Sequence, residues 1–191
     1  MTTAAATPAL AAEALLTAEQ YAAAPDDGRL TELVHGKVIE MPPPGTLHGY
    51  IAANISGIVR EFVRANGLGR VIGNDAGVIS RRQPDSVRGP DVAFFSFIRL
   101  QRGPLPEGYP VVAPELVFEV RSPSDRWAAI TAKAGEYLNA GVVCVCVVDP
   151  ETESVAVYLE NELPRRHTVE EELTLAEVLP GLVIPLRQFF E

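Results

Sequence analysis

Two carboxylates interrupt stretches of the sequence that are otherwise apolar. Asp91 follows Pro90 at the start of an apolar run, and Glu119 lies inside another, between Phe118 and Val120. A carboxylate inside a buried strand is costly unless it is paired or binds a cation. Two such acids on neighbouring strands would offer the oxygen ligands that Mg²⁺ prefers. The sequence therefore predicts a metal site at these two acids, where the ion would activate water and neutralise a phosphate.

Each acid also has an ordinary structural explanation. Asp91 can cap the start of its strand, and for that residue the two explanations are equally favoured. Glu119 can pair with Arg121, which lies two residues later on the same strand face. That pair would leave both charges inside an apolar strand, so the metal site is favoured for Glu119.

The elements that must position these acids follow from the spacing of apolar residues. Segments 115–121, 126–140 and 142–148 have the patterns of a strand, a helix and a strand, which together form a βαβ unit with parallel strands. Apolar residues recur at helical spacing over 47–66 and predict a long amphipathic helix. Residues 70–80 are expected to form one strand, and the polar stretch 81–89 to connect it to the strand of Asp91.

The two ends of the chain have their own patterns. His35-Gly36 between two apolar runs predicts a tight hairpin, in which Leu33 faces Val38 and Glu40 shares that face. Segment 175–191 is expected to form a helix, a turn and a second helix. We expect a flexible extension over 1–16 and one domain over 17–191, of α/β class, with a mixed central sheet flanked by helices and an N-terminal β-hairpin.

Charge and composition restrict the function classes. The net charge of −9 disfavours nonspecific DNA binding, which depends on neutralising phosphates. Residues 60–102, however, hold eight arginines and four acids, so this stretch could face an anionic partner. Phosphate-loop, dinucleotide and Gly-X-Ser-X-Gly patterns are not found. Cys144 and Cys146 are too close along one strand for a disulfide, and with no secretory signal or membrane span the expected location is the cytoplasm.

Several motifs, taken in order, resemble one protein family. Pro90-Asp91 followed by Glu119-Val120-Arg121 resembles the PD-(D/E)XK nuclease superfamily. The whole set resembles more closely the Uma family of restriction endonucleases, from about Leu16 to the C-terminus. The matching stretches are Thr31 to Met41, Leu47-His48-Gly49, Arg88 to Phe94, Glu119 to Asp125, Lys133, Tyr137 to Val142, and Val148-Asp149-Pro150. The resemblance implies a restriction-endonuclease-like core.

The same resemblance implies roles for individual residues. Asp91 and Glu119 would bind Mg²⁺, with Mn²⁺ as a substitute. The superfamily's lysine two positions after the glutamate is replaced here by Arg121, which cannot act as a base. In the superfamily this lysine helps to position or activate the attacking water. Lys133 on the next helix would take over that role, and Arg121 would stabilise the phosphate. Lys133 alone would otherwise pass for a surface lysine whose charged end reaches solvent.

Two further residues, and the partners, are expected on the same basis. Glu40 would supply an additional acid from the N-terminal region, and His48 in the first turn of the long helix would join the site. A lone histidine there is as readily an exposed or capping residue. The resemblance implies DNA as substrate, and enzymes that cut both strands often form two-fold homodimers.

The leading hypothesis is thus a metal-dependent endonuclease that hydrolyses DNA. The net charge and Arg121 favour an alternative, in which a nuclease-like module no longer cuts and binds nucleic acid or a protein partner. A third possibility is an interaction protein whose buried acids are purely structural.

Overall fold

The structure is a computed structural model that describes residues 14–25 and 27–191. The predicted extension over 1–16 therefore lies mostly outside the described residues. Its last residue, Leu16, is held in place, because its N–H donates to the carbonyl of Gly36 at 2.9 Å. Among the described residues no helix is long and apolar enough to cross a membrane.

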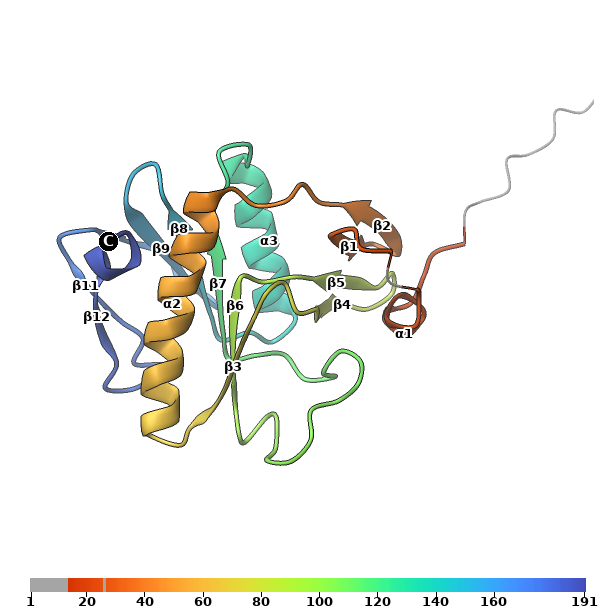
Figure 1. Ribbon diagram of the computed structural model, residues 1–191, viewed down its shortest axis with the longest axis horizontal. Coiled ribbons are helices and arrows are strands. Elements are labelled where there is room, and N and C mark those ends of the chain that lie inside the picture. Colours follow the sequence, from red (N-terminus) through yellow and green to blue (C-terminus); the bar gives the residue numbers. More distant parts are fainter. Residues whose placement is uncertain (1–13, 26) are drawn as a thin grey trace, which may run out of the picture.

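A six-stranded mixed sheet forms the centre of the fold (Figure 1). Its order is β10-β9-β8-β7-β6-β3, and only β7 and β8 are parallel. The strands are β3 (Gly69–Gly73), β6 (Val92–Ser96), β7 (Leu116–Val120), β8 (Cys144–Asp149), β9 (Ser154–Leu159) and β10 (Arg165–Thr168). Helix α3 (Trp127–Asn139) connects β7 to β8, so the predicted βαβ unit is confirmed.

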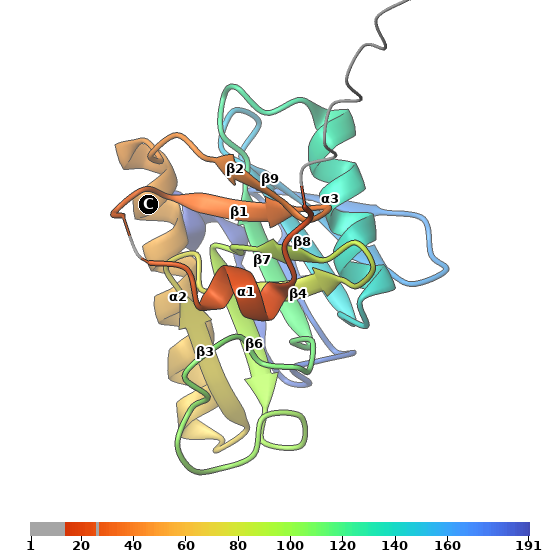
Figure 2. The same cartoon turned by 90° about the vertical axis from the view of Figure 1, so that its right-hand side faces the viewer.

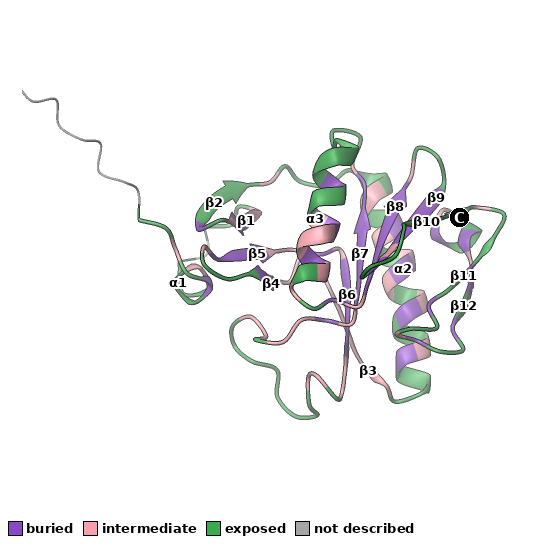
Figure 3. Cartoon of the chain, turned by 180° about the vertical axis from the view of Figure 1, so that it is seen from behind, coloured by how far each residue is buried: buried purple, intermediate pink, exposed green. Residues whose placement is uncertain are grey.

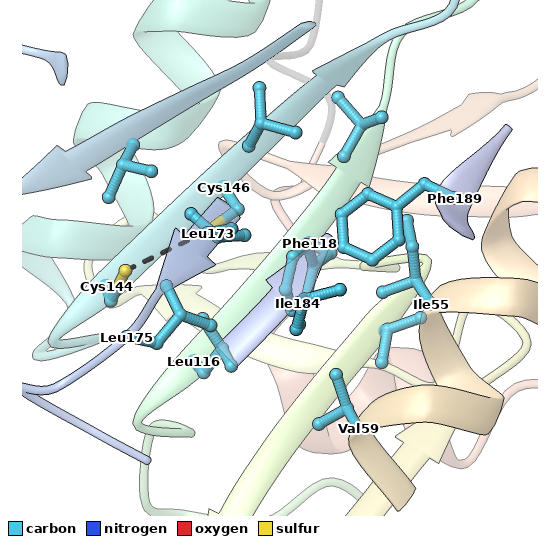
Figure 4. Close-up of a cluster of buried hydrophobic side chains, with 14 of the residues drawn as sticks. Ile55, Val59, Leu116, Phe118, Cys144, Cys146, Leu173, Leu175, Ile184 and Phe189 are labelled. Carbon is cyan, nitrogen blue, oxygen red and sulfur yellow. Dashed lines mark hydrogen bonds between the residues drawn. The ribbon is translucent and has the colours of Figure 1, made fainter. Parts of the chain in front are cut away.

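Alternation along the strands divides the core between the two faces of this sheet. Helix α2 (Thr46–Ala65) covers one face, together with β11 (Glu172–Thr174), β12 (Val183–Pro185) and the 3-10 helix η1 (Leu186–Phe189). Figure 4 shows Phe118 and Phe189 in contact there, with Ile55 of α2 beside them. Helix α3 covers the other face, where Val117 and Val145 meet Tyr137. The neighbouring strands β7 and β8 are buried throughout, which suits residues covered by helices on both sides (Figure 3).

A second, four-stranded sheet lies beside the first, on the side where α3 packs (Figures 1 and 2). Its order is β2-β1-β5-β4, with β1 (Thr31–Val34), β2 (Lys37–Glu40), β4 (Val78–Arg81) and β5 (Ser86–Arg88), and the short α1 (Ala18–Ala22) packs against it. The predicted hairpin and its register are confirmed: Leu33 pairs with Val38, and His35 and Gly36 have φ of 50° and 77°.

Three expectations about local structure are wrong. Segment 70–80 is broken into β3 and β4, in different sheets, because Asn74 and Asp75 take left-handed backbone conformations with φ of 63° and 55°. The polar stretch 81–89 contains β5, which pairs with both β1 and β4. The tail 175–191 forms no α-helix: β12 turns back to pair with β11, and only η1 is helical.

Candidate functional site

The cavity and the two acids

A cavity of about 380 Å³ opens where the large sheet, the small sheet and both long helices meet. Its lining includes Asp91 and Glu119 from the large sheet, His48 from α2, Lys133 from α3 and Glu32 from β1. Five segments that are far apart in the sequence therefore place a charged or titratable side chain in one space. The topology brings them there because β6 and β7 are neighbours and α3 returns across β7.

Asp91 lies just before β6, directly beside the buried glutamate. Val92 pairs with Phe118, so continuing this antiparallel register by one residue places Asp91 opposite Glu119. The carboxylate of Asp91 accepts a hydrogen bond from the Val120 N–H at 2.6 Å. Burial and the charge of Glu119 together raise the pKa of Asp91 to about 8. Without metal Asp91 is therefore mostly protonated at neutral pH, and a cation bound between the two acids would favour its ionised form.

Glu119 is held by two donors from α3. Its Oε1 accepts from the Tyr137 hydroxyl at 2.8 Å, and Lys133 Nζ donates to its Oε2 at 3.0 Å. Burial raises the pKa of Glu119, and these two partners act in the opposite direction. The expected proximity of Lys133 to Glu119 is thus present in the structure. Among the described residues, Glu119 pairs with Lys133 rather than with Arg121, so the structural alternative considered for it does not hold.

Glu32 and the network behind Lys133

Lys133 has a second carboxylate partner that the sequence did not suggest. Its ammonium lies 3.1 Å from Glu32 Oε1, and that oxygen also accepts from the Gly89 N–H at 3.0 Å. Burial alone would lower the pKa of Lys133, but the charges of Glu119 and Glu32 raise it overall. The lysine is therefore a fixed positive charge at neutral pH.

Behind Glu32 a chain of charged residues continues into the small sheet. Arg88 Nη1 donates to Glu32 Oε2 at 2.9 Å, and the other side of the same guanidinium binds both oxygens of Glu136. Glu136 also accepts from the Ser80 hydroxyl. Burial acts to raise the pKa of Glu32, but Lys133, Arg88 and the Gly89 N–H lower it overall, so Glu32 stays ionised.

Two residues at the rim

His48 reaches the cavity from the first turn of α2. Its Nε2 lies 3.4 Å from Asp91 Oδ1, and its side chain is only 14% exposed. Burial lowers the pKa of His48, which keeps the ring neutral at pH 7. The structure thus brings His48 to Asp91 rather than leaving it exposed.

Asp75 lies at the rim in the left-handed turn between β3 and β4. Burial raises its pKa, and its charge in turn raises the pKa of Asp91. The turn packs closely on Gly89, where a side chain would meet the Cβ of Asp75 at 2.9 Å. Gly89 thus lets this turn approach the segment that carries Asp91.

Residues that lie elsewhere

Glu40 and Arg121 are not brought to the cavity. The Glu40 side chain is 62% exposed and pairs with Arg29 at 3.2 Å, because β2 is the edge strand of the small sheet and is exposed along its whole length. Arg121 binds Asp149 at 2.9 Å and also Glu151, since the strand ends at Val120 and its side chain turns away. The N-terminal acid in the cavity is Glu32, not Glu40.

The role of Glu32 in the cavity could be predicted from the sequence only by predicting β5. The pairing of Leu33 with Val87 places Glu32 next to Arg88 on the adjacent strand. Residues 81–89 are polar, however, and give no period-2 pattern of apolar residues. The one feature of the sequence that draws attention to Glu32 is an acid between Thr31 and Leu33 in a short predicted strand.

Fit to a divalent cation

The donors of the cavity suit a hard cation that keeps much of its water. Among residues 14–25 and 27–191 no group of three His, Cys, Asp or Glu side chains converges as a complete metal cage. Mg²⁺ is commonly held by one or two carboxylates with water in its other positions, so Asp91 and Glu119 are a sufficient pair. Burial and the charge of Glu119 both disfavour the ionised form of Asp91 and raise its pKa, and a bound cation would oppose both effects.

Comparison with known proteins

Comparisons with known proteins agree with this fold. A solved structure from Anabaena variabilis, described as "a putative nuclease belonging to DUF820", matches with a TM-score of 0.77 over 92% of this chain and 97% of the other. At 19% identity this likeness shows a shared fold and confirms the predicted fold class. A search of curated proteins gives no significant match. The model of the Uma2 family, described as "Putative restriction endonuclease", matches residues 18–187. Since that match spans most of the chain, the protein belongs to the Uma2 family.

Proposed function

We propose that this protein is a Mg²⁺-dependent endonuclease that hydrolyses phosphodiester bonds of DNA, with Mn²⁺ as a substitute metal. One observation carries the proposal. Asp91 and Glu119 face each other in a cavity in which Lys133 is already bonded to Glu119, within a chain of a restriction-endonuclease family.

The proposed metal ligands are Asp91 and Glu119. When bound, Mg²⁺ would lower the pKa of a coordinated water and offset charge on the phosphate. The chain's own contribution begins with the Val120 N–H, which holds Asp91 toward the cavity. Tyr137 and Lys133 hold Glu119 in the same way from α3.

Lys133 and His48 have different tasks in this proposal. Because neighbouring carboxylates keep Lys133 protonated, it orients the attacking water and stabilises negative charge, and it does not remove a proton. His48 is neutral and lies at Asp91, so its ring is the group suited to accept the proton of that water. Glu32 keeps Lys133 in place. Glu40 and Arg121 have no part in the chemistry.

Nucleases that cut both strands often pair two such cavities around a two-fold axis. We therefore extend the proposal to a two-fold homodimer, located in the cytoplasm, where the free and buried Cys144 and Cys146 would remain reduced. Light scattering coupled to size-exclusion chromatography measures the mass in solution, and a monomer at working concentrations would contradict the dimer.

Cleavage assays with duplex, single-stranded and branched DNA test the proposed activity. The parent protein should cut at least one of them with Mg²⁺ or Mn²⁺, and Asp91→Ala and Glu119→Ala should abolish the cutting. Isothermal titration with Mn²⁺ provides a readout that does not depend on activity. Metal binding without cleavage of any substrate would instead support the non-cutting module.

A further inference from the structure

Among residues 14–25 and 27–191, two arginines at the end of the sheet opposite the cavity are ordered by neighbours that carry no charge. Arg102, in the loop after β6, places its guanidinium 3.8 Å from the centre of the Phe97 ring. Arg70 of β3 lies over the same ring, at 6.0 Å. Stacking on an aromatic face orients a guanidinium and leaves its edge available. We call Arg70, Phe97 and Arg102 the arginine platform.

Backbone carbonyls complete the ordering of the platform. Arg102 donates to the carbonyl of Gly67 at 3.2 Å, and Arg70 donates to the carbonyl of Gly103. Arg102 of the β6–β7 loop therefore bonds the α2–β3 turn, and Arg70 at the start of β3 bonds the β6–β7 loop. Figures 1 and 2 show the two segments, the β6–β7 loop and the α2–β3 turn, at the same end of the sheet.

Most other ordered arginines of the described chain are neutralised by acids. Arg88, Arg99 and Arg165, for example, each lie within 4.0 Å of a carboxylate. A carbonyl carries no net charge, so both positive charges of the platform remain uncompensated. Apart from Arg99, which pairs with Glu115, segments 60–70 and 97–107 hold four arginines and only two acids, Glu61 and Glu107. In a chain with a net charge of −9, this is a local reversal of sign.

We infer that the arginine platform is a docking surface for the phosphate backbone of DNA, distinct from the cavity. Two planar guanidinium edges with free donors suit phosphate oxygens, which they can bind in a bidentate manner. The inference rests on the proposed function for its choice of DNA as the polyanion. The cavity lies beyond the start of β6 and the platform beyond its end, a span of roughly 20 Å at about 3.4 Å per residue. That span equals about six base pairs, so one duplex of ordinary length is long enough to reach both.

Fluorescence anisotropy with a labelled 30-base-pair duplex tests the platform without requiring cleavage. Binding is measured in EDTA over a range of salt concentrations for the parent and for the double variant Arg70→Gln/Arg102→Gln. The variant should bind about tenfold more weakly, and the slope of log K against log salt should fall by about 1.8, or 0.9 per lost phosphate contact. Phe97→Leu, which keeps the apolar contact but not the ring, should produce a smaller loss in the same direction.

The matched control is Arg165→Gln/Arg187→Gln, which removes the same charge from two exposed arginines that have carboxylate partners. It should bind within about twofold of the parent. Equal loss in both double variants would overturn the inference, because the effect would then be one of net charge. It is also overturned if the parent does not bind the duplex at low salt, or if the platform variant loses binding to phosphatidylserine vesicles and not to DNA.

The failure of this inference can be distinguished from failure of the proposed function. A parent that binds the duplex through the platform but neither binds Mn²⁺ nor cuts DNA would refute only the proposed activity. A parent that cuts DNA while the platform variant binds and cuts as well as the parent would refute only the docking surface.

Discussion

Asp91→Asn should stabilise the metal-free protein at neutral pH. Asp91 has a pKa of about 8 in the folded state, against an ordinary value of 3.8, because it is buried and faces Glu119. A group whose pKa is raised by folding contributes most stability below its unfolded pKa, and that contribution is lost as the pH rises through the folded pKa. At pH 7 the lost stability has a ceiling of roughly 4 kcal/mol, at 1.36 kcal/mol per pKa unit.

Asparagine is never ionised and can still accept the hydrogen bond of the Val120 N–H. We expect about half of the ceiling to be recovered, roughly 2 kcal/mol, because the cavity is open to water. For a domain of this size that corresponds to a rise in Tm of about 4–8 °C. The gain should shrink to roughly 0.6 kcal/mol at pH 4, just above the unfolded pKa of 3.8, and vanish below about pH 3, where Asp91 of the parent is protonated in both the folded and unfolded states.

Differential scanning fluorimetry at pH 4 and pH 7.5, with EDTA and with Mg²⁺, measures these effects. Mg²⁺ should raise the Tm of the parent and leave that of Asp91→Asn unchanged, because a ligand stabilises only the protein that binds it. A variant that is less stable than the parent at pH 7.5 in EDTA would refute the reasoning. Asp91 would then be a structural acid, as the interaction-protein hypothesis holds.

Further predictions concern the residues around the cavity. Glu32→Gln should lower the free energy of unfolding by about 3 kcal/mol in chemical denaturation, because two buried cations lose their shared carboxylate. Its matched control Glu40→Gln, on the exposed edge strand of the same hairpin, should leave both stability and Mn²⁺ affinity unchanged, and equal effects of the two changes would contradict the assignment of Glu32. Arg121→Gln should lower the Tm by removing the buried cation that bonds Asp149 at 2.9 Å, with Mn²⁺ affinity within about twofold of the parent. Weaker metal binding without a change in Tm would indicate that Arg121 belongs to the metal site.

The parts of the fold that depend on local pattern were predictable. The hairpin follows from the two-residue turn at His35-Gly36, and its register from the length of that turn. The unit β7-α3-β8 follows from two apolar runs around a helical period. That Asp91 lies opposite Glu119 could be predicted only from this unit together with the family resemblance. The spacing of the two acids in the sequence does not by itself show that they are neighbours.

The remainder depends on contacts between distant segments. Glu32 and Glu40 lie on opposite faces of one hairpin, and only Glu32 reaches the cavity. Pairing of β1 with β5 places Glu32 beside Arg88, and the polar sequence of β5 does not indicate a strand. In the tail, Leu175, Leu179 and Leu182 have the spacing of a helix, yet all three are buried in a turn against the large sheet. The pairing of β11 with β12 across this turn outweighs that local spacing.

The order in which residues are synthesised determines when the ion pairs around Lys133 can form. Glu32 emerges from the ribosome about one hundred residues before the lysine that it holds, and Asp91 and Glu119 emerge between them. During synthesis the acids of the cavity are therefore present without the cation that keeps Glu119 in place. Strand β8, which pairs with β7, comes later still. A chain that ends before Lys133 therefore cannot form the ion pairs that hold Glu32 and Glu119 in the finished protein.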